Sequence, residues 1–391
     1  MSMVTFLRRL FIRDYQNVGD ENVRSAHGVL AAVQGFIINL TLVAIKLTLA
    51  FILASRTSWI FPMALLGDAV DSAGDMLSNM VTLIGFKGAS KAPDKDHPYG
   101  HQRMEYVAGL IVALLVLFAA FELVKSSIET IMSGASASYS WATVIALGVC
   151  ALLKLLQGFI NLGLAKAIDS PSLKATAIDS FVDIAATGAV IVSAVLSLLF
   201  NWNFLDGYFG IAVALFITYT GIMMVKETSD PLIGTPFTKE EEEHIRALAQ
   251  SEKRILGVHD VRLHRYGPSK TFISLHAEVS LDLSATEIHE MIHAVEEKIA
   301  EAYRAEVTIH VDPIDEKDEE LSRVKKQVEE ILVSLDPHLS LHDFQREGNG
   351  YDFDVLVPFE VKIETALIEA KIKEAFGDTP MHIRFDRPYT E

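Results

Sequence analysis

The stretch Gly67–Asp75 reads GDAVDSAGD and lies within the otherwise apolar segment 60–86. It carries three carboxylates, Asp68, Asp71 and Asp75. On a helix, Asp71 and Asp75 are four residues apart and share one face, with Asp68 on or near it. Each charge at the centre of a bilayer costs roughly 3 kcal/mol. The stretch therefore predicts a membrane helix in which a partner must compensate the carboxylates.

The apolar residues of this 391-residue chain are unevenly distributed, although they make up 50% of it overall. Long runs almost free of charge occupy residues 23–226, and the remainder is strongly charged. A membrane-spanning helix needs about 20 apolar residues. Six segments meet this requirement, which predicts a six-helix membrane bundle: 27–54, 60–86, 104–132, 140–165, 173–200 and 205–226.

The charges indicate the orientation of these helices and the class of ligand. Lys and Arg gather before the first span, after the second, the fourth and the sixth, which places both termini in the cytoplasm. Residues 1–226 hold 15 basic and 15 acidic side chains, so the net charge of −17 comes from the tail. An acidic tail repels nucleic acid and suits cations.

Two further features limit the possibilities. Cys150 is the single cysteine and lies in an apolar run, so we expect a small core residue and no intrachain disulfide. Residues 1–22 are amphipathic and basic but lack a small-residue cleavage site, so we expect a cytoplasmic segment at the membrane interface.

The tail alternates helix and strand patterns twice. Residues 227–315 predict an α-β-β-α-β domain whose first helix is capped by Thr238. The same order recurs in residues 316–391, where alignment of Gly267 with Gly348 matches HDVRLHRYG to HDFQREG. This indicates an internal duplication of an α+β, ferredoxin-like unit.

A second carboxylate pair occurs in the fifth predicted span. There the sequence AIDSFVD places Asp179 and Asp183 at the same spacing as Asp71 and Asp75. Two helices that each turn two carboxylates inward would form a four-oxygen cage, and we expect no Lys or Arg on those faces. Such a cage is stabilised either by protons or by a bound cation, which is the chemistry of a metal/proton antiporter. Oxygen ligands favour hard cations, so Mn²⁺ is the expected substrate, ahead of iron, zinc or cadmium.

Together with the loop DKDHPYGHQRMEYVAGL and the tail motifs GVHDVRLHRYG and TIHVDP, these features resemble the cation diffusion facilitator family of metal/proton antiporters. The resemblance covers residues 23 to about 315. All-aspartate members are often manganese exporters, whereas a His in the fifth span is usual in zinc or cadmium exporters. The residue at that position here is Asp179. The resemblance further implies a homodimer of six-helix bundles in a bacterial plasma membrane, each with a cytoplasmic α-β-β-α-β domain.

The resemblance also implies roles for individual residues. Asp71, Asp75, Asp179 and Asp183 correspond to the transport ligands, and Asp68 falls outside that set. Arg103 and Asp230 correspond to a charge pair that steadies the protomers. A cytoplasmic-facing loop metal site corresponds to Asp94, His97 and His101. Metal sites near the dimer interface, suited to Zn²⁺ or similar ions, correspond to His259, His276, His289, His310 and Asp312.

The second tail unit departs from the family pattern. His342 stands at the place of His259, but the alignment puts Val357 at the place of His276 and Arg384 at the place of His310. We therefore expect residues 316–391 to keep the fold, to lack most metal ligands and to have a structural or regulatory role.

The sequence thus predicts a divalent-cation exporter, with Mn²⁺/H⁺ antiport by alternating access as the favoured activity. A Zn²⁺, Fe²⁺ or Cd²⁺ exporter of the same family is the alternative. A membrane-anchored metal sensor would have no use for intramembrane carboxylates. An enzyme is not expected, because no nucleophile with an adjacent base and no phosphate-binding glycine loop is evident.

Overall fold

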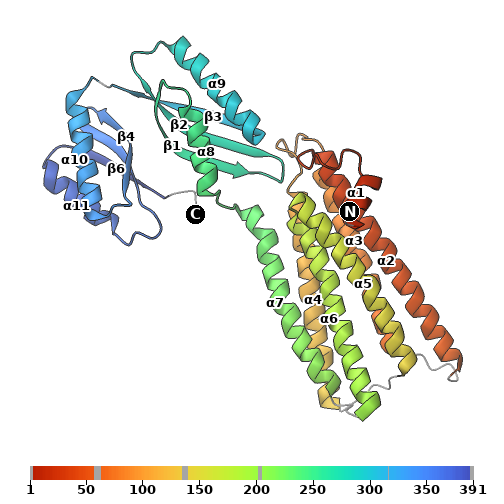
Figure 1. The fold of residues 1–391 in the computed structure, drawn as a ribbon. Coiled ribbons are helices and arrows are strands. Elements are labelled where there is room, and N and C mark those ends of the chain that lie inside the picture. The colour runs from red at the N-terminus through yellow and green to blue at the C-terminus, as the bar shows by residue number, and fades with distance from the viewer. Residues whose placement is uncertain (1–2, 57–62, 134–139, 201–204, 316, 388–391) are drawn as a thin grey trace. The chain divides into compact units, whose positions relative to one another are not determined.

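The computed structural model describes residues 3–56, 63–133, 140–200, 205–315 and 317–387, and some side chains beside these gaps are also outside the description. The chain divides into two compact units. The first comprises residues 1–234 and the turn 266–269, and the second comprises residues 235–265 and 270–391. Figure 1 shows helices in the first unit and mixed helices and strands in the second.

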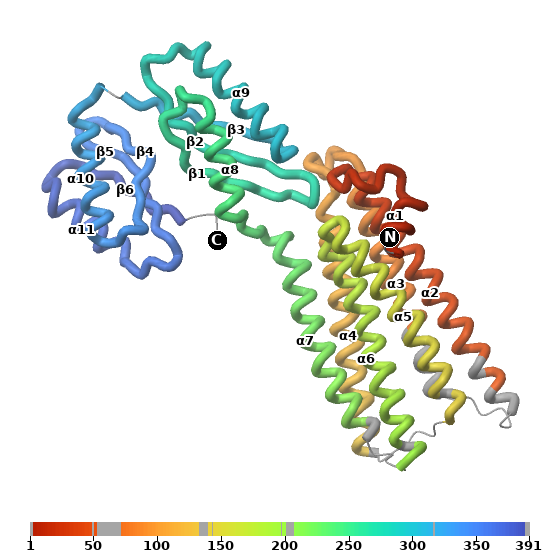
Figure 2. The backbone as a smooth tube through the Cα atoms, viewed as in Figure 1, coloured from red at the N-terminus to blue at the C-terminus, as the bar shows by residue number. Residues whose placement is uncertain are grey.

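The first unit is a helical bundle. Its helices are α1 (Met3–Phe11), α2 (Glu21–Arg56), α3 (Met63–Ala89), α4 (Met104–Ser133), α5 (Trp141–Ile168), α6 (Pro171–Phe200) and α7 (Leu205–Ile233). Five helices among the described residues, α2, α4, α5, α6 and α7, are long and apolar enough to cross a membrane. The remaining predicted span becomes α3, which is 27 residues long and carries Asp75. The long helices run side by side in Figure 2.

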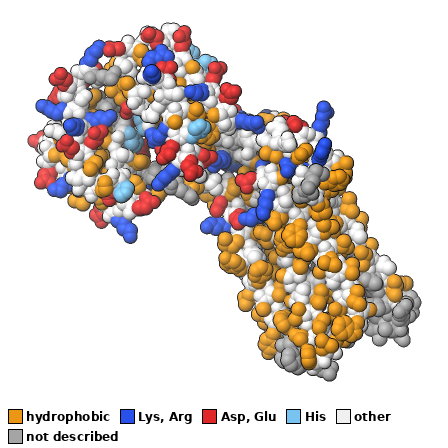
Figure 3. Space-filling view, in the orientation of Figure 1, with side chains coloured by type: hydrophobic (Ala, Val, Ile, Leu, Met, Phe, Trp, Pro, Cys, Tyr) orange, Lys and Arg blue, Asp and Glu red, His pale blue; other side chains and the backbone are white. Residues whose placement is uncertain are grey.

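The surface of the bundle is apolar. Large side chains such as Phe118, Phe121, Leu152 and Leu215 are each more than 60% exposed. Figure 3 shows this apolar surface over the helical unit. Small residues pack inside, including Ala113, Ala120 and Ala175. An apolar exterior around a closely packed interior is the pattern expected for helices surrounded by lipid.

The second unit begins with α8 (Lys239–Gln250), β1 (Ile255–Arg265), β2 (Thr271–Ser280), α9 (Ala285–Tyr303) and β3 (Ala305–Ile314). The strands form a sheet of order β1-β2-β3, antiparallel between β1 and β2 and parallel between β2 and β3. Alternate residues of β2, including Ile273 and Leu275, are buried in one core with residues of α8 and α9. Thr238 caps α8 as predicted, through a complete capping box with Glu241.

The remainder of this unit has the same order of elements: α10 (Glu319–Leu335), β4 (Ser340–Glu347), β5 (Gly350–Leu356), α11 (Thr365–Phe376) and β6 (Met381–Asp386). Its sheet is β4-β5-β6 with the same antiparallel and parallel pairings. Phe353 and Val355 lie in its own hydrophobic core with α10 and α11. The two halves have separate hydrophobic cores, so each half packs as an α+β subdomain of its own.

Each half carries an irregularity at the corresponding place of its first strand. The pairing of β1 with β2 shifts between His259 and Arg262, and that of β4 with β5 shifts between His342 and Gln345. Inside these bulges Asp260 has φ 49° and Asp343 has φ 56°. The left-handed conformation is uncommon for a residue other than glycine, although Asp tolerates it better than most. The repeated His-Asp dipeptide therefore coincides with a repeated backbone feature.

Candidate metal sites

Three of the predicted transport residues meet inside the bundle. Asp75 comes from α3, and Asp179 and Asp183 come from successive turns of α6. One carboxylate oxygen of each lies within 4.8 Å of the others. The spacing of four residues directs Asp179 and Asp183 to one side of α6, as the sequence predicted. Three converging carboxylates supply oxygen ligands suited to a hard divalent cation.

A lysine lies among these carboxylates, contrary to expectation. Lys154 of α5 has its Nζ atom 2.5 Å from Asp75 Oδ2 and 2.7 Å from Asp183 Oδ2. Its side chain is only 7% exposed. The prediction that no Lys faces the aspartates is therefore wrong. Its signal was present in the sequence, because a charged residue in the apolar run CALLKLLQG is costly and needs a partner.

The fourth predicted ligand lies outside the described side chains, as does Asp68. Asp71 is part of helix α3, but its side chain is not described. The next residue, Ser72, is buried and accepts a hydrogen bond from Lys46 Nζ at 2.7 Å. The lysine of α2 thus lies beside α3 at this turn, and the four-aspartate cage stays a prediction with respect to Asp71.

Buried amides occupy the bundle near the aspartates. Asn79 is one turn beyond Asp75 and donates to the Asp75 carbonyl oxygen at 2.7 Å. Its Oδ1 atom, Oε1 of Gln157 and both side-chain polar atoms of Asn39 are buried without a hydrogen-bond partner among the described residues. Unpaired amide groups in a membrane interior are unfavourable unless water or an ion reaches them. These side chains therefore make the bundle interior near Asp75 polar.

The loop between α3 and α4 gathers Asp94, His97 and His101 as predicted. Asp94 Oδ1 lies 3.4 Å from His97 Nδ1, and Asp94 Oδ2 lies 3.5 Å from His101 Nε2. Hydrogen bonds from Lys91 and from the His97 backbone hold the pKa of Asp94 well below its usual range. Nδ1 of His101 is buried without a hydrogen-bond partner within the described part of the chain. An ionised carboxylate beside two imidazoles is a donor set that divalent metals accept.

Three of the tail histidines form a row across the first sheet. His259 of β1 pairs with His276 of β2, which pairs with His310 of β3. Neighbouring residues of β2, Leu275 and Ala277, are buried in the helix-covered core. Since side chains alternate between faces along a strand, His276 lies on the face without helices. The strand register therefore explains how residues far apart in sequence gather.

Asp312 links this row. Its Oδ2 atom lies 2.9 Å from His276 Nδ1 and 3.2 Å from His259 Nε2, and its Oδ1 atom lies 3.2 Å from His310 Nε2. Burial opposes ionisation of Asp312, but hydrogen bonds from His259 and His276 outweigh it and keep its pKa below the usual range. The hydrogen bond to Asp312 in turn raises the pKa of His276.

Two predicted residues are placed differently. His289 lies on α9 and stacks on His293 at 6.1 Å between ring centroids, outside the groups of potential ligands found among the described residues. Arg103 donates to the Tyr266 carbonyl oxygen at 3.1 Å and lies over the Tyr266 ring. The predicted ion pair of Arg103 with Asp230 is not formed among the described residues of one chain.

The second sheet carries a different row. His342 of β4 pairs with Asp354 of β5, which pairs with Arg384 of β6. The residue at the place of His276 is therefore Asp354, and the alignment with Val357 was wrong by three positions; Val357 instead belongs to the core of this half. Arg384 Nε donates to Asp354 Oδ1 at 2.6 Å. A guanidinium thus occupies the position at which the first sheet offers a third imidazole.

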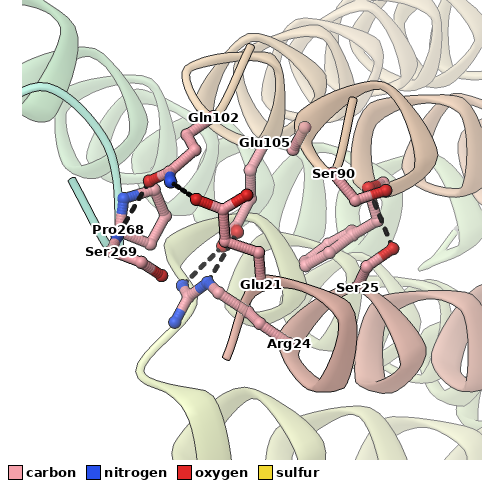
Figure 4. A pocket seen from close by; sticks show the side chains of 10 residues that line it. Glu21, Arg24, Ser25, Ser90, Gln102, Glu105, Pro268 and Ser269 are labelled. Atoms are coloured by element: carbon pink, nitrogen blue, oxygen red, sulfur yellow. Dashed lines mark hydrogen bonds and ion pairs between the residues drawn. The ribbon is translucent and has the colours of Figure 1, made fainter. Parts of the chain in front are cut away.

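A small pocket lies at one end of the helical unit. Arg24 of α2 makes two hydrogen bonds of 2.8 Å to the buried carboxylate of Glu105 on α4, and Gln102 bridges Glu21 and the backbone of Ser269. Figure 4 shows these side chains converging. A bidentate buried pair fixes the relative position of two helices. Arg24 is one of the basic residues that precede the first predicted span and indicate its orientation, but its pairing with Glu105 was not predicted.

An apolar helical bundle with carboxylates at its centre, followed by an α+β unit with histidine-rich clusters, defines an integral membrane protein that handles metal cations. Comparison with known families agrees. The cation efflux transmembrane domain matches residues 32–233, and the cytoplasmic domain of cation efflux proteins matches residues 237–314. The chain belongs to the cation efflux family, whose members are transporters rather than enzymes. The second matched domain is a dimerisation domain and supports a homodimer.

Several relatives cover most of this chain. An uncharacterized transporter of Methanocaldococcus jannaschii is 30% identical over 71% of this chain and 95% of its own length. The manganese efflux system protein MneS of Bacillus subtilis is 27% identical over 76% and 99%. The cation-efflux pump FieF of Shewanella oneidensis is 27% identical over 70% and 90%.

Acidification should weaken Zn²⁺ binding at the Asp312 cluster. The pKa of His276 is raised by its hydrogen bond to Asp312, so His276 takes up a proton at a higher pH than an ordinary histidine, and that proton competes with the metal. We expect the Zn²⁺ affinity, measured by chelator competition, to fall between about pH 8 and about pH 6. His276→Ala should remove this pH-dependent component of Zn²⁺ binding, and the exposed His338→Ala should leave it unchanged. Equal affinity at both pH values would contradict the prediction.

Proposed function

We propose that the protein exports a divalent metal cation in exchange for protons, with Mn²⁺ as the favoured substrate. One observation carries the proposal: Asp75, Asp179 and Asp183 meet inside a membrane bundle around a buried lysine. Carboxylates in an apolar medium require a cation or protons. A site that alternates between the two couples metal movement to proton movement.

The donor atoms support manganese. All the described members of the membrane cluster are aspartates, and oxygen ligands suit Mn²⁺ better than Zn²⁺. The printed name of one relative, a manganese efflux system protein, agrees with this preference. Another relative is named only a cation-efflux pump, so Zn²⁺, Fe²⁺ or Cd²⁺ export is the alternative, and it would show as preferential transport of those ions in a metal panel.

Lys154 is a third cation, besides the metal ion and the protons, that can occupy the aspartate cluster. Its ammonium group bonds two carboxylates and neutralises charge that a metal ion would otherwise neutralise. An arriving metal must therefore displace Lys154 from Asp75 and Asp183. We propose that Lys154 serves as a tethered cation that returns to the carboxylates when the metal leaves, so fewer protons are needed to empty the site.

The proposed path begins in the cytoplasm. The Lys and Arg distribution favours cytoplasmic termini, as the positive-inside rule predicts. The acidic tail and the Asp94–His97–His101 loop then attract the cation on that side. Buried amides such as Asn79 and Gln157 supply polar groups near Asp75. Alternating access of the bundle would deliver the metal outward.

The alternative to a transporter is a metal sensor that the helices anchor in the membrane. It would use the tail clusters but would gain nothing from Asp75, Asp179 and Asp183 at the cost of burying charge. Metal uptake by reconstituted vesicles separates the two, because a sensor transports nothing.

We also propose that residues 316–391 are a second, degenerate copy of residues 227–315. The identical order of elements, the identical strand pairings and the matched His-Asp bulges support this. In the second copy Arg384 supplies the positive charge beside Asp354. The Arg384 guanidinium therefore lies beside Asp354 at the position where the first copy has potential metal ligands. Lys154 is comparable, because it places a side-chain cation beside the membrane carboxylates.

Neutralising one membrane carboxylate should stop transport. Asp75→Asn or Asp183→Asn removes a charged ligand while keeping side-chain size, so we expect the proton-driven Mn²⁺ flux into proteoliposomes to fall at least about tenfold. Asp282→Asn, at an exposed position of the second unit, is the matched control and should transport normally. Undiminished flux in both membrane variants would refute the site assignment.

Removing the tethered cation should change proton release. In Lys154→Met the carboxylates lose their internal partner and hold about one more proton in the metal-free state, so Mn²⁺ binding should release about one additional proton per ion. Titration calorimetry in buffers of different ionisation enthalpy measures this number. Lys166→Met, at an exposed position of the same helix, is the control. Unchanged proton release in Lys154→Met would argue against the displacement mechanism.

A further inference from the structure

Two histidines of the second unit, one from each half, meet at the repeated bulges. The ring centroids of His259 on β1 and His342 on β4 lie 5.2 Å apart, with 32° between the ring planes. Both residues are more than 90% buried, His259 at 7% and His342 at 9% exposure. Contact between corresponding residues of two similar units is the arrangement found near the axis of a two-fold interface. The contact therefore joins the halves at matching positions.

One ring nitrogen of each histidine lacks a partner. Nδ1 of His259 and Nδ1 of His342 are buried without a hydrogen bond among the described residues, whereas Nε2 of His259 lies 3.2 Å from Asp312 Oδ2. Buried polar groups are nearly always satisfied in folded proteins, so unpaired imidazole nitrogens need an explanation such as an ion.

A carboxylate completes the group. One ligand atom each of His259, Asp260 and His342 lies within 4.8 Å of the others, a spacing that can accommodate one metal ion. The left-handed backbone of Asp260 belongs to the bulge. Bulges and strained residues often direct a side chain toward a functional site. Two imidazoles and one carboxylate form a donor set suited to Zn²⁺ or Co²⁺.

This group shares one residue, His259, with the Asp312 cluster. Asp312 Oδ2 lies 2.9 Å from His276 Nδ1 and 3.2 Å from His259 Nε2, and one ligand atom of each of these three residues lies within 4.8 Å of the others. His259 lies between the two groups and belongs to both sets. The second unit therefore offers ligands for two ions, with His276 specific to one set and His342 to the other.

We propose that His259, Asp260 and His342 form a second cytoplasmic metal site, of the Zn²⁺ class, which links the two halves of the tail. Residues 316–391 supply His342, so this half of the tail takes part in metal binding. Occupancy of the site holds β4 against β1, whereas loss of the ion leaves buried imidazoles unpaired and weakens that contact. The proposal concerns the cytoplasmic unit and stands independently of which ion crosses the membrane.

The test counts the ions bound by the full-length protein purified in detergent. The protein is loaded with Zn²⁺, freed of excess metal and analysed by elemental mass spectrometry. His342→Ala should bind one Zn²⁺ fewer per chain than the wild type, or bind it at least about tenfold more weakly. Asp260→Asn should do the same while keeping the bulge, because Asn tolerates the left-handed conformation. His338→Ala, an exposed histidine of the same half that is paired with Asp336, should match the wild type.

The two sites are separated by combining variants. His276→Ala should remove a different ion, so His276→Ala/His342→Ala should lose two ions. Co²⁺ replacing Zn²⁺ gives a second measurement, in which His342→Ala removes part of the visible absorption and His276→Ala another part. Unchanged stoichiometry and affinity in both His342→Ala and Asp260→Asn would overturn the proposal. So would a double variant that loses no more than His276→Ala alone.

Discussion

The structure depends on one constraint, which is that carboxylates placed in an apolar interior must share that interior with positive charge. Asp75 and Asp183 meet this requirement through Lys154, which bonds both of them. Lys154 cannot leave unless another cation or protons take its place. The convergence of Asp75 from α3 with Asp179 and Asp183 from α6 and the approach of Lys154 from α5 are consistent with this requirement.

The same constraint operates in the second unit with different partners. Asp312 is surrounded by three imidazoles, which accept either protons or a metal. Asp354, at the corresponding place of the second sheet, is paired with Arg384, whose charge is permanent. The sheet of residues 227–315 therefore carries residues that can bind a metal ion. The sheet of residues 316–391 carries the permanent charge of Arg384 at the corresponding place, and its His342 contacts His259.

Much of this arrangement could be predicted from the sequence. Strongly apolar segments predicted the bundle helices, and the DxxxD spacing pointed to Asp75, Asp179 and Asp183, which the structure brings together, because both patterns are local. The Thr238 cap is local in the same sense. Lys154 was missed because its partners come from other helices, although its place in an apolar run was a signal. The alignment of Val357 with His276 failed because strand register depends on the bulge after His342, which the sequence does not show directly.

The central claim is that metal and protons move in opposite directions through the aspartate cluster. It is tested most directly in proteoliposomes that contain the wild-type protein, a manganese indicator and a pH-sensitive dye. An imposed outward proton gradient should drive Mn²⁺ into the vesicles, and Mn²⁺ added without a gradient should move protons outward. Mn²⁺ uptake that is insensitive to the proton gradient and moves no protons, or no uptake of any divalent metal, would contradict the account.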